Sequence, residues 1–203
     1  MFNLKKLIKI GGIKFEKPNV VDRILEKLFL WAFPGFVKPN HLTIFRYLMT
    51  PIVFFLLIDK SYALGLVLFA ITVFTDALDG AMARTRNQIT NWGKLHDPLA
   101  GKILIGSAGA VLITRYIGVE IITIILLLEF STVIAAIHLY DDEKREIGAR
   151  LPGKIKMVCQ SFGVGTLLLY SIYQSGIALG FAHAFFYLAI IFSASNIILY
   201  RAL

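Results

Sequence analysis

The sequence has little charge and almost no cysteine. Only 17% of its 203 residues are Asp, Glu, Lys or Arg, whereas soluble domains usually contain about 25%. The single cysteine, Cys159, excludes an intramolecular disulfide framework, and we expect it to be a small core residue within an apolar run. The shortage of charge argues against an ordinary soluble domain, and the shortage of cysteine argues against a disulfide-stabilised one.

Long apolar runs take the place of the missing charge. Hydrophobic residues make up 57% of the chain, and a helix that crosses a bilayer needs about 20 apolar residues. Turn and charge signals divide the runs into six segments, so the sequence predicts an all-α integral membrane protein with six transmembrane helices. The expected spans are residues 41–58, 61–84, 94–115, 118–140, 154–174 and 178–201.

A helix of another kind is expected before the first span. In residues 20–36 the charged side chains lie off the apolar face, which indicates an amphipathic helix in the membrane interface with Trp31 at headgroup depth. A soluble helix packed on the bundle is the alternative. The apolar face consists of Val21, Ile24, Leu25, Leu28 and Phe29. We therefore divide the chain into a cytoplasmic N-terminal segment, residues 1–37, and a membrane domain, residues 38–203.

The positive charges are distributed on one side of the expected bundle. With the N-terminus in the cytoplasm, all but two of the 21 Lys and Arg residues, Lys60 and Arg115, fall on cytoplasmic segments or helix ends. Both termini are therefore expected in the cytoplasm, in a bacterial-type cytoplasmic membrane. The net charge of +8 fits anionic lipid better than nucleic acid. The basic first ten residues lack the features of a secretory signal peptide, and we expect none.

Three carboxylates lie within or at the ends of the apolar spans. An ionised group at membrane depth costs about 2.5–3.5 kcal/mol, and Asp76, Asp79 and Asp97 would also repel one another. A divalent cation would compensate all three, and oxygen ligands suit Mg²⁺ or Mn²⁺ better than zinc. Arg84 suits phosphate recognition. The alternatives are an intramembrane salt-bridge network of Asp76, Asp79 and Arg84 without metal, and a small transporter that uses the acids.

The same segment resembles a known enzyme family. The pattern D-x2-D-G-x2-A-R-x8-G-x3-D-x3-D is typical of the CDP-alcohol phosphatidyltransferases. Seven of its positions are filled here with the family's spacing: Asp76, Asp79, Gly80, Ala83, Arg84, Gly93 and Asp97. The stretches PNHLTIFR (Pro39–Arg46) and GKIKMVCQ (Gly153–Gln160) are also similar to the family, and the resemblance covers residues 38–200 approximately.

The resemblance implies an enzyme of phospholipid biosynthesis. Such enzymes transfer a phosphatidyl group from a CDP-lipid such as CDP-diacylglycerol to the hydroxyl of a small alcohol, and release CMP. They have six transmembrane helices, usually form homodimers, and open their active site to the cytoplasm and the lipid leaflet. Carried over by position, Asp76, Asp79 and Asp97 would hold Mg²⁺ or Mn²⁺, and Arg84 would stabilise the departing CMP. The CDP-lipid site would comprise Asn40, Thr43, Asp76, Gly80, Ala83, Arg84 and Gly93.

One position departs from the pattern. The family has a fourth carboxylate four residues after Asp97, where it is expected to act as general base, and this chain has Gly101. Loss of a positioned base typically lowers the rate by about 10²–10⁴-fold. An inactivating change, a natural variant with another base, and a chain that has lost activity are the three explanations. His96 is the nearest substitute, but it lies about 100° round the helix from Asp97. A non-catalytic CDP-lipid binder is therefore a further possibility.

The acceptor alcohol is indicated only by a basic cluster. Arg150, Lys154 and Lys156 lie at a cytoplasmic break, which suits a phosphorylated acceptor such as glycerol 3-phosphate or inositol phosphate. Ordinary positive-inside charge and lipid headgroup contact are the alternative explanations. The chain length and the G-K-x-K stretch are most similar to glycerophosphate transferases, so we expect glycerol 3-phosphate.

Overall fold

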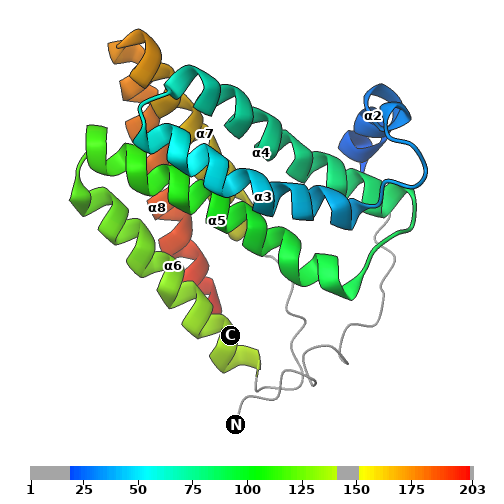
Figure 1. The fold of residues 1–203 in the computed structure, drawn as a ribbon. Coiled ribbons are helices and arrows are strands. Elements are labelled where there is room, and N and C mark those ends of the chain that lie inside the picture. Colours follow the sequence, from blue (N-terminus) through cyan, green and yellow to red (C-terminus); the bar gives the residue numbers. More distant parts are fainter. Residues whose placement is uncertain (1–18, 141–150, 202–203) are drawn as a thin grey trace. The chain divides into compact units, whose positions relative to one another are not determined.

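A computed structural model describes residues 19–140 and 151–201 of the chain, and each element in this part is a helix. The order is shown in Figure 1. The elements are α2 (Val20–Leu28), the 3₁₀ helix η1 (Leu30–Ala32), α3 (Pro39–Ile58), α4 (Tyr62–Thr85), α5 (Asn91–Tyr116), α6 (Val119–Tyr140), α7 (Leu151–Tyr173) and α8 (Gly176–Arg201). The all-α prediction is confirmed, and each expected span corresponds to one long helix.

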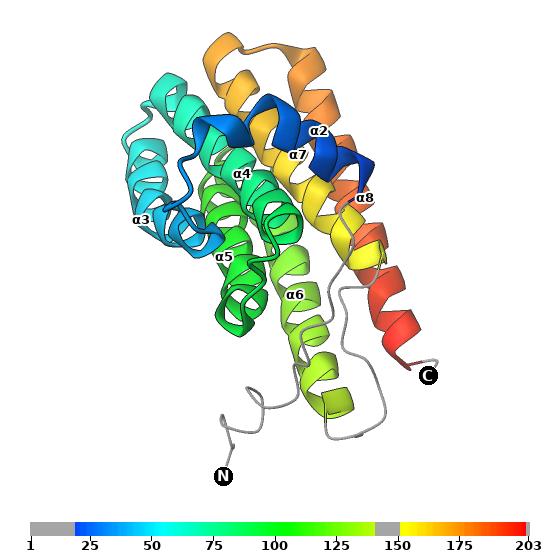
Figure 2. The same cartoon turned by 90° about the vertical axis from the view of Figure 1, so that its right-hand side faces the viewer.

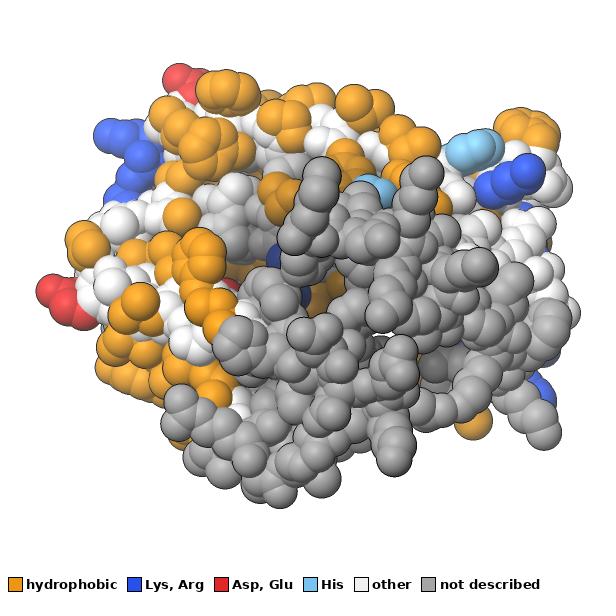
Figure 3. Space-filling view, turned by 90° about the horizontal axis from the view of Figure 1, so that it is seen from below, with side chains coloured by type: hydrophobic (Ala, Val, Ile, Leu, Met, Phe, Trp, Pro, Cys, Tyr) orange, Lys and Arg blue, Asp and Glu red, His pale blue; other side chains and the backbone are white. Residues whose placement is uncertain are grey.

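The long helices have the length and composition of membrane spans. Five of the described helices, α3, α4, α5, α7 and α8, are long and apolar enough to cross a bilayer. In the view of Figure 3, hydrophobic side chains cover much of the described surface. The protein is therefore an integral membrane protein, while the sixth span, over α6, stays a prediction.

The N-terminal amphipathic helix is shorter than expected. Helix α2 ends at Leu28, and only one turn of 3₁₀ helix follows it. The residue before a proline is disfavoured in the helical conformation, so Pro34 prevents a helix from continuing through Phe33, whose backbone is extended. The prediction of one helix over residues 20–36 was wrong at its C-terminal end.

Helix α5 begins three residues earlier than the sequence indicated. The Thr90 hydroxyl accepts a hydrogen bond from the Gly93 backbone N–H at 2.9 Å, as an N-cap residue does. Three of the tight connections between helices, α3–α4, α5–α6 and α7–α8, use backbone with positive φ at Lys60, Gly118 and Gln174 respectively. Gly118, with φ of 145°, is the one that requires glycine.

The chain forms two compact units. One comprises residues up to 53 together with 68–104, and the other comprises residues 54–67 together with 105–203. In the second unit α7 packs against α8, and α6 also contacts α8. Figures 1 and 2 both show α7 and α8 side by side.

A close contact fixes the packing of α7 on α8. Phe186 on α8 is buried, and a Cβ atom placed on Gly163 would lie 2.8 Å from Cζ of its ring. Small residues allow such close approach between membrane helices. Gly165, two residues further along α7, has no atom within 4 Å of its Cβ position and provides a matched control.

We therefore expect Gly163→Ala to destabilise the protein by about 1–3 kcal/mol, as overpacking does. Gly165→Ala should leave stability unchanged or slightly raised. Thermal unfolding of both variants in detergent measures the difference, and equal midpoints would contradict the packing described.

Candidate functional site

The three acidic side chains of the pattern lie in the first unit, around one arginine. Asp76 and Asp79 come from α4 and Asp97 from α5, as the spacing predicted. Arg46, from α3, lies between them. Its Nη1 atom is 2.6 Å from Oδ1 of Asp76, and its Nη2 atom donates a short hydrogen bond to Oδ2 of Asp79.

Arg46 also reaches the third acidic residue through the backbone. Its Nη1 atom donates to the carbonyl oxygen of Asp97 at 3.2 Å. The Arg46 side chain has no exposed surface, and that of Asp79 is 2% exposed. A charge in such surroundings is stable only when it is paired and hydrogen-bonded. Arg46 therefore pairs directly with Asp76 and Asp79 and compensates one of the three negative charges.

Helix α3 contributes polar contacts to Asp97 and Gly93. The buried hydroxyl of Thr43 donates a short hydrogen bond to Oδ1 of Asp97. The Thr90 hydroxyl donates to Oδ1 of Asn40 at 2.9 Å. A Cβ atom on Gly93 would lie 3.1 to 3.3 Å from oxygens of Thr90, Asp97 and Asn40. The structure thus brings together four residues that the sequence assigned separately to the site.

Arg84 does not join the acidic cluster. Its Nε and Nη2 atoms each donate to one carboxylate oxygen of Asp22 on α2, both at 2.7 Å. The salt-bridge alternative named Arg84 as the partner of Asp76 and Asp79, but Arg46 has that place. A Cβ atom on Gly80 would come within 3.1 Å of Nη2 of Arg84. Gly80 therefore leaves room for the folded-back guanidinium.

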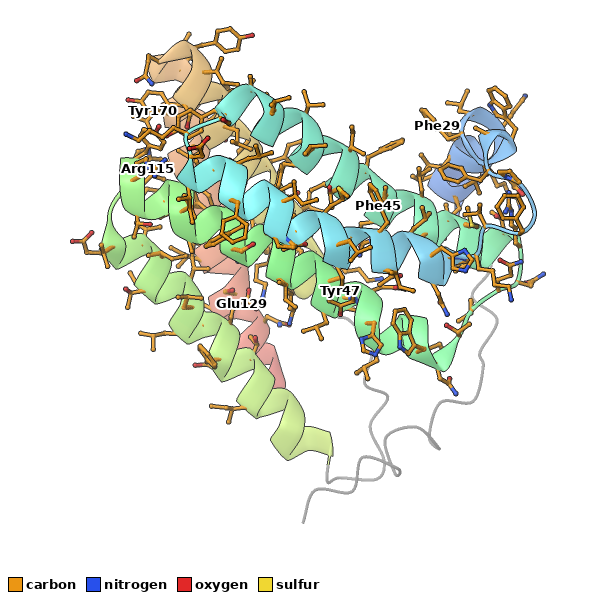
Figure 4. The ribbon with its side chains drawn as sticks, viewed as in Figure 1. Phe29, Phe45, Tyr47, Arg115, Glu129 and Tyr170 are labelled. Carbon is orange, nitrogen blue, oxygen red and sulfur yellow. The ribbon has the colours of Figure 1, made fainter. Side chains whose placement is uncertain are left out.

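The remaining pattern positions lie nearby on α4 and α5. Gly101 is buried on α5, one helical turn after Asp97. Ala83 is half-buried on α4. His96 stacks on Trp92 with ring centroids 4.2 Å apart, and its Nδ1 atom is 3.4 Å from the hydroxyl of Tyr47. Tyr47 is labelled in Figure 4. His96 is thus held by two aromatic side chains.

Of the basic residues assigned to the acceptor phosphate, the two that the structure describes have different surroundings. Lys156 is buried in the second unit, with its Nζ atom 2.6 Å from Oε1 of Glu129, which is labelled in Figure 4. Gln160 donates to the same oxygen at 3.2 Å. Lys154 is exposed, and residues two apart on a helix do not face each other. Arg150 lies outside the described residues.

Comparison with known proteins identifies the family. The sequence profile described as CDP-alcohol phosphatidyltransferase matches residues 36–195. The chain belongs to this family. It is therefore an integral membrane enzyme of phospholipid biosynthesis, and the transporter alternative is set aside.

Several relatives carry the name CDP-diacylglycerol–glycerol-3-phosphate 3-phosphatidyltransferase. The relative from Rickettsia typhi (strain ATCC VR-144 / Wilmington) is 32% identical over 136 residues, which are 66% of this chain and 76% of the relative. The one from Bacillus subtilis (strain 168) is 28% identical over 173 residues, 78% and 90% of the two chains. The one from Mycoplasma genitalium (strain ATCC 33530 / DSM 19775 / NCTC 10195 / G37) is 30% identical over 216 residues, 85% and 91%.

Enzymes of this family generally depend on a divalent metal ion. Asp76, Asp79 and Asp97 offer the hard oxygen donors that such ions prefer, and the side chain of Asp76 is 48% exposed and so can be reached. As placed, however, no three acidic, histidine or cysteine side chains of the described ranges form a group ready to hold a metal. The donor chemistry fits, but an ion would have to draw carboxylates away from Arg46.

Sequence reasoning missed Arg46, Thr90 and Asp22. Arg46 stands in an apolar span, so the argument that a charge at membrane depth needs a partner applied to it as well as to the aspartates. Thr90 has the N-cap signal of a threonine before a helix. Asp22 lies among charged residues on a short amphipathic helix, and its sequence position gives no sign that it is 3% exposed.

We expect Arg46→Gln to destabilise the protein by about 3–5 kcal/mol, because it leaves buried carboxylates without their partner. Adding Asp79→Asn should restore a large part of the loss, since the most buried of the unpaired charges is then removed. The matched control is Lys94→Gln at an exposed position of α5. Thermal unfolding of the wild-type chain, Arg46→Gln, Asp79→Asn and the double variant gives the coupling, with Lys94→Gln measured beside them, and strictly additive effects would contradict the ion pair.

Proposed function

We propose that this enzyme transfers a phosphatidyl group from CDP-diacylglycerol to glycerol 3-phosphate and releases CMP. The observation that carries the proposal is the convergence of Asn40, Thr43, Gly93 and Asp97 beside the carboxylates that contact Arg46. Gly93 and Asp97 are positions of the family pattern, and Asn40 and Thr43 belong to the stretch PNHLTIFR that also resembles the family. The names of the relatives from Rickettsia typhi, Bacillus subtilis and Mycoplasma genitalium support glycerol 3-phosphate as the acceptor. Inositol phosphate is the alternative acceptor.

In this proposal the side chains divide into binding and charge-stabilising roles. Asn40, Thr43, Gly80, Ala83 and Gly93 line the CDP-lipid site. The small residues let the polar side chains approach the site closely, and the polar ones hydrogen-bond to the nucleotide. Arg84 faces the departing phosphate and stabilises its charge, because a guanidinium offers paired N–H donors to phosphate oxygens.

The metal ion of the proposal is Mg²⁺ or Mn²⁺, held by Asp76, Asp79 and Asp97. When bound, a divalent ion neutralises pyrophosphate charge and polarises the phosphorus. An ion held there would have to draw one or both carboxylates away from Arg46, whose hydrogen bond from α3 to the backbone carbonyl of Asp97 on α5 does not involve them.

The acceptor hydroxyl must lose a proton as its oxygen attacks the phosphorus. In the family pattern the fourth carboxylate is expected to take this proton, and Gly101 offers no acceptor group one turn after Asp97. His96 is occupied by contacts with Trp92 and Tyr47. We therefore propose that this chain binds CDP-diacylglycerol and turns it over slowly, with a non-catalytic CDP-lipid binder as the limiting case.

Gly101→Asp should raise the rate of CMP release by about 10²–10⁴-fold, the usual effect of a positioned general base. The assay contains CDP-diacylglycerol, Mg²⁺ and glycerol 3-phosphate, with inositol phosphate and glycerol as competing acceptors. Gly106→Asp, on the same helix with open space at its Cβ position, controls for added charge. Silence of both the wild-type chain and Gly101→Asp across the acceptors would contradict the transferase proposal.

For the acceptor phosphate, the exposed Lys154 is the strongest of the three basic candidates. The charge of Lys156 is compensated by Glu129, so Lys156 stabilises the packing of α6 against α7 and is a weaker candidate for binding phosphate. Arg150 remains a candidate by sequence. We further propose that both termini and the active site face the cytoplasm of a bacterial-type membrane, and that the enzyme is a homodimer.

Helix α2 is proposed to lie in the membrane interface. Leu25 and Phe33 pack against a core cluster that includes Leu78 and Met82, whereas Trp31 on η1 is 79% exposed. The exposed apolar side chains of α2 are Val20, Val21, Ile24 and Leu28. In the interface, this apolar face would contact lipid acyl chains, and the exposed Arg23 and Lys27 would contact anionic headgroups.

In a Trp92→Phe background, Trp31 reports the position of this segment. We expect its fluorescence to be quenched by phospholipids brominated near the headgroup and to be protected from aqueous iodide. The control is the double variant Trp31→Phe, Trp92→Phe, which lacks tryptophan and gives the background fluorescence from tyrosine. Strong iodide quenching without quenching by bromolipid would contradict the interfacial position.

A further inference from the structure

The ion pair between Asp22 and Arg84 joins the N-terminal helix to the family pattern. Arg84 donates from Nε and Nη2 to the two carboxylate oxygens of Asp22, both at 2.7 Å. This paired geometry fixes the plane of the guanidinium as well as its distance. Asp22 therefore determines how the arginine of the pattern is oriented.

The Asp22 carboxylate is itself held firmly. It also accepts a hydrogen bond from the Asn19 backbone N–H at 2.8 Å, within the first turn of α2. The hydrogen bonds from Arg84 keep its pKa below the ordinary value of 3.8, although burial opposes this effect. The carboxylate is thus charged at neutral pH, and the pair is lost only as the pH falls below the ordinary range of aspartate.

The guanidinium of Arg84 also lies close to the backbone of α4 at the glycine of the pattern. Nη2 and Nη1 would lie 3.1 and 3.4 Å from a Cβ atom on Gly80. Any larger residue at position 80 would therefore press on the guanidinium that Asp22 holds.

Apolar contacts keep α2 at the place that this ion pair needs. The ring of Phe29, which follows α2, meets the ring of Phe74 on α4 edge-on, with centroids 5.0 Å apart. Figure 4 shows Phe29 beside α2. Leu25, three residues after Asp22, packs against the cluster containing Leu78 and Met82. Asp22 and Leu25 thus share the packed face of the helix.

We propose that Asp22 is a positioning residue that orients the Arg84 guanidinium toward the phosphate of a CDP-lipid. The position of α2 then determines the affinity of the site for the CDP-lipid. This inference rests on the proposed function, in which Arg84 faces that phosphate. It adds to the site a residue more than 50 positions before the family pattern, on a different helix.

The test measures the Kd of CDP-diacylglycerol for the full chain in nanodiscs, which requires no turnover. Asp22→Asn keeps the shape but removes the charge, and should raise the Kd by about tenfold, the lower end of the effect that loss of a supporting partner has on metal ligands. Asp22→Glu should recover most of the affinity. Glu26→Gln removes the same charge from an exposed position of α2 and should leave the Kd unchanged.

A double-mutant cycle separates positioning from stability. In an Arg84→Gln background, Asp22→Asn should cause no further loss of affinity, because the group it orients is already gone. If Asp22→Asn instead lowers only the unfolding temperature, or weakens binding equally in both backgrounds, the inference is overturned. A wild-type chain that does not bind CDP-diacylglycerol overturns the proposed function together with the inference. Wild-type binding with an unchanged Kd in Asp22→Asn overturns the inference alone.

Discussion

Arg46 supplies the positive charge that lets the carboxylates of Asp76 and Asp79 lie close together. Without a cation among them, Asp76 and Asp79 would repel each other and lose hydration with no compensation. The guanidinium meets both and also the carbonyl of Asp97, so one side chain from α3 links α4 and α5. The positions of Thr43 and Asn40, on the same helix, follow from this link. The candidate site is therefore organised by a cation that the protein itself carries.

The sequence was sufficient for the helices and for the acidic residues. Apolar run length and breaker residues placed every long helix within a few residues, because a bilayer imposes the length of the helices that cross it. The helix ends were less predictable. Pro34 ends the N-terminal helical segment and Thr90 caps the start of α5, and both act through local backbone geometry. The acids were found because a charge in an apolar run demands a partner. The sequence could not identify that partner, because Arg46 and Arg84 are both arginines within reach of the acidic residues by sequence. Only the structure distinguishes them.

The glycines of the family pattern acquire a shared explanation in the structure. Neither Gly80 nor Gly93 has left-handed backbone, since both lie within helices. A Cβ atom on either would press against polar side chains, those of Arg84 at Gly80 and those of Asn40, Thr90 and Asp97 at Gly93. Space for side chains that converge on one region, rather than chain flexibility, accounts for glycine at these positions.

Gly101 changes the charge of the site as well as its chemistry. When Asp76, Asp79 and Asp97 are ionised, Arg46 leaves two net negative charges, which one divalent ion would balance. A fourth carboxylate, one turn after Asp97, would add repulsion toward the diphosphate of a CDP-lipid while offering a base for the acceptor. In the proposed site its absence would favour binding of the anionic substrate and disfavour proton removal. Affinity and turnover are expected to diverge in this chain because both depend on the same position of α5.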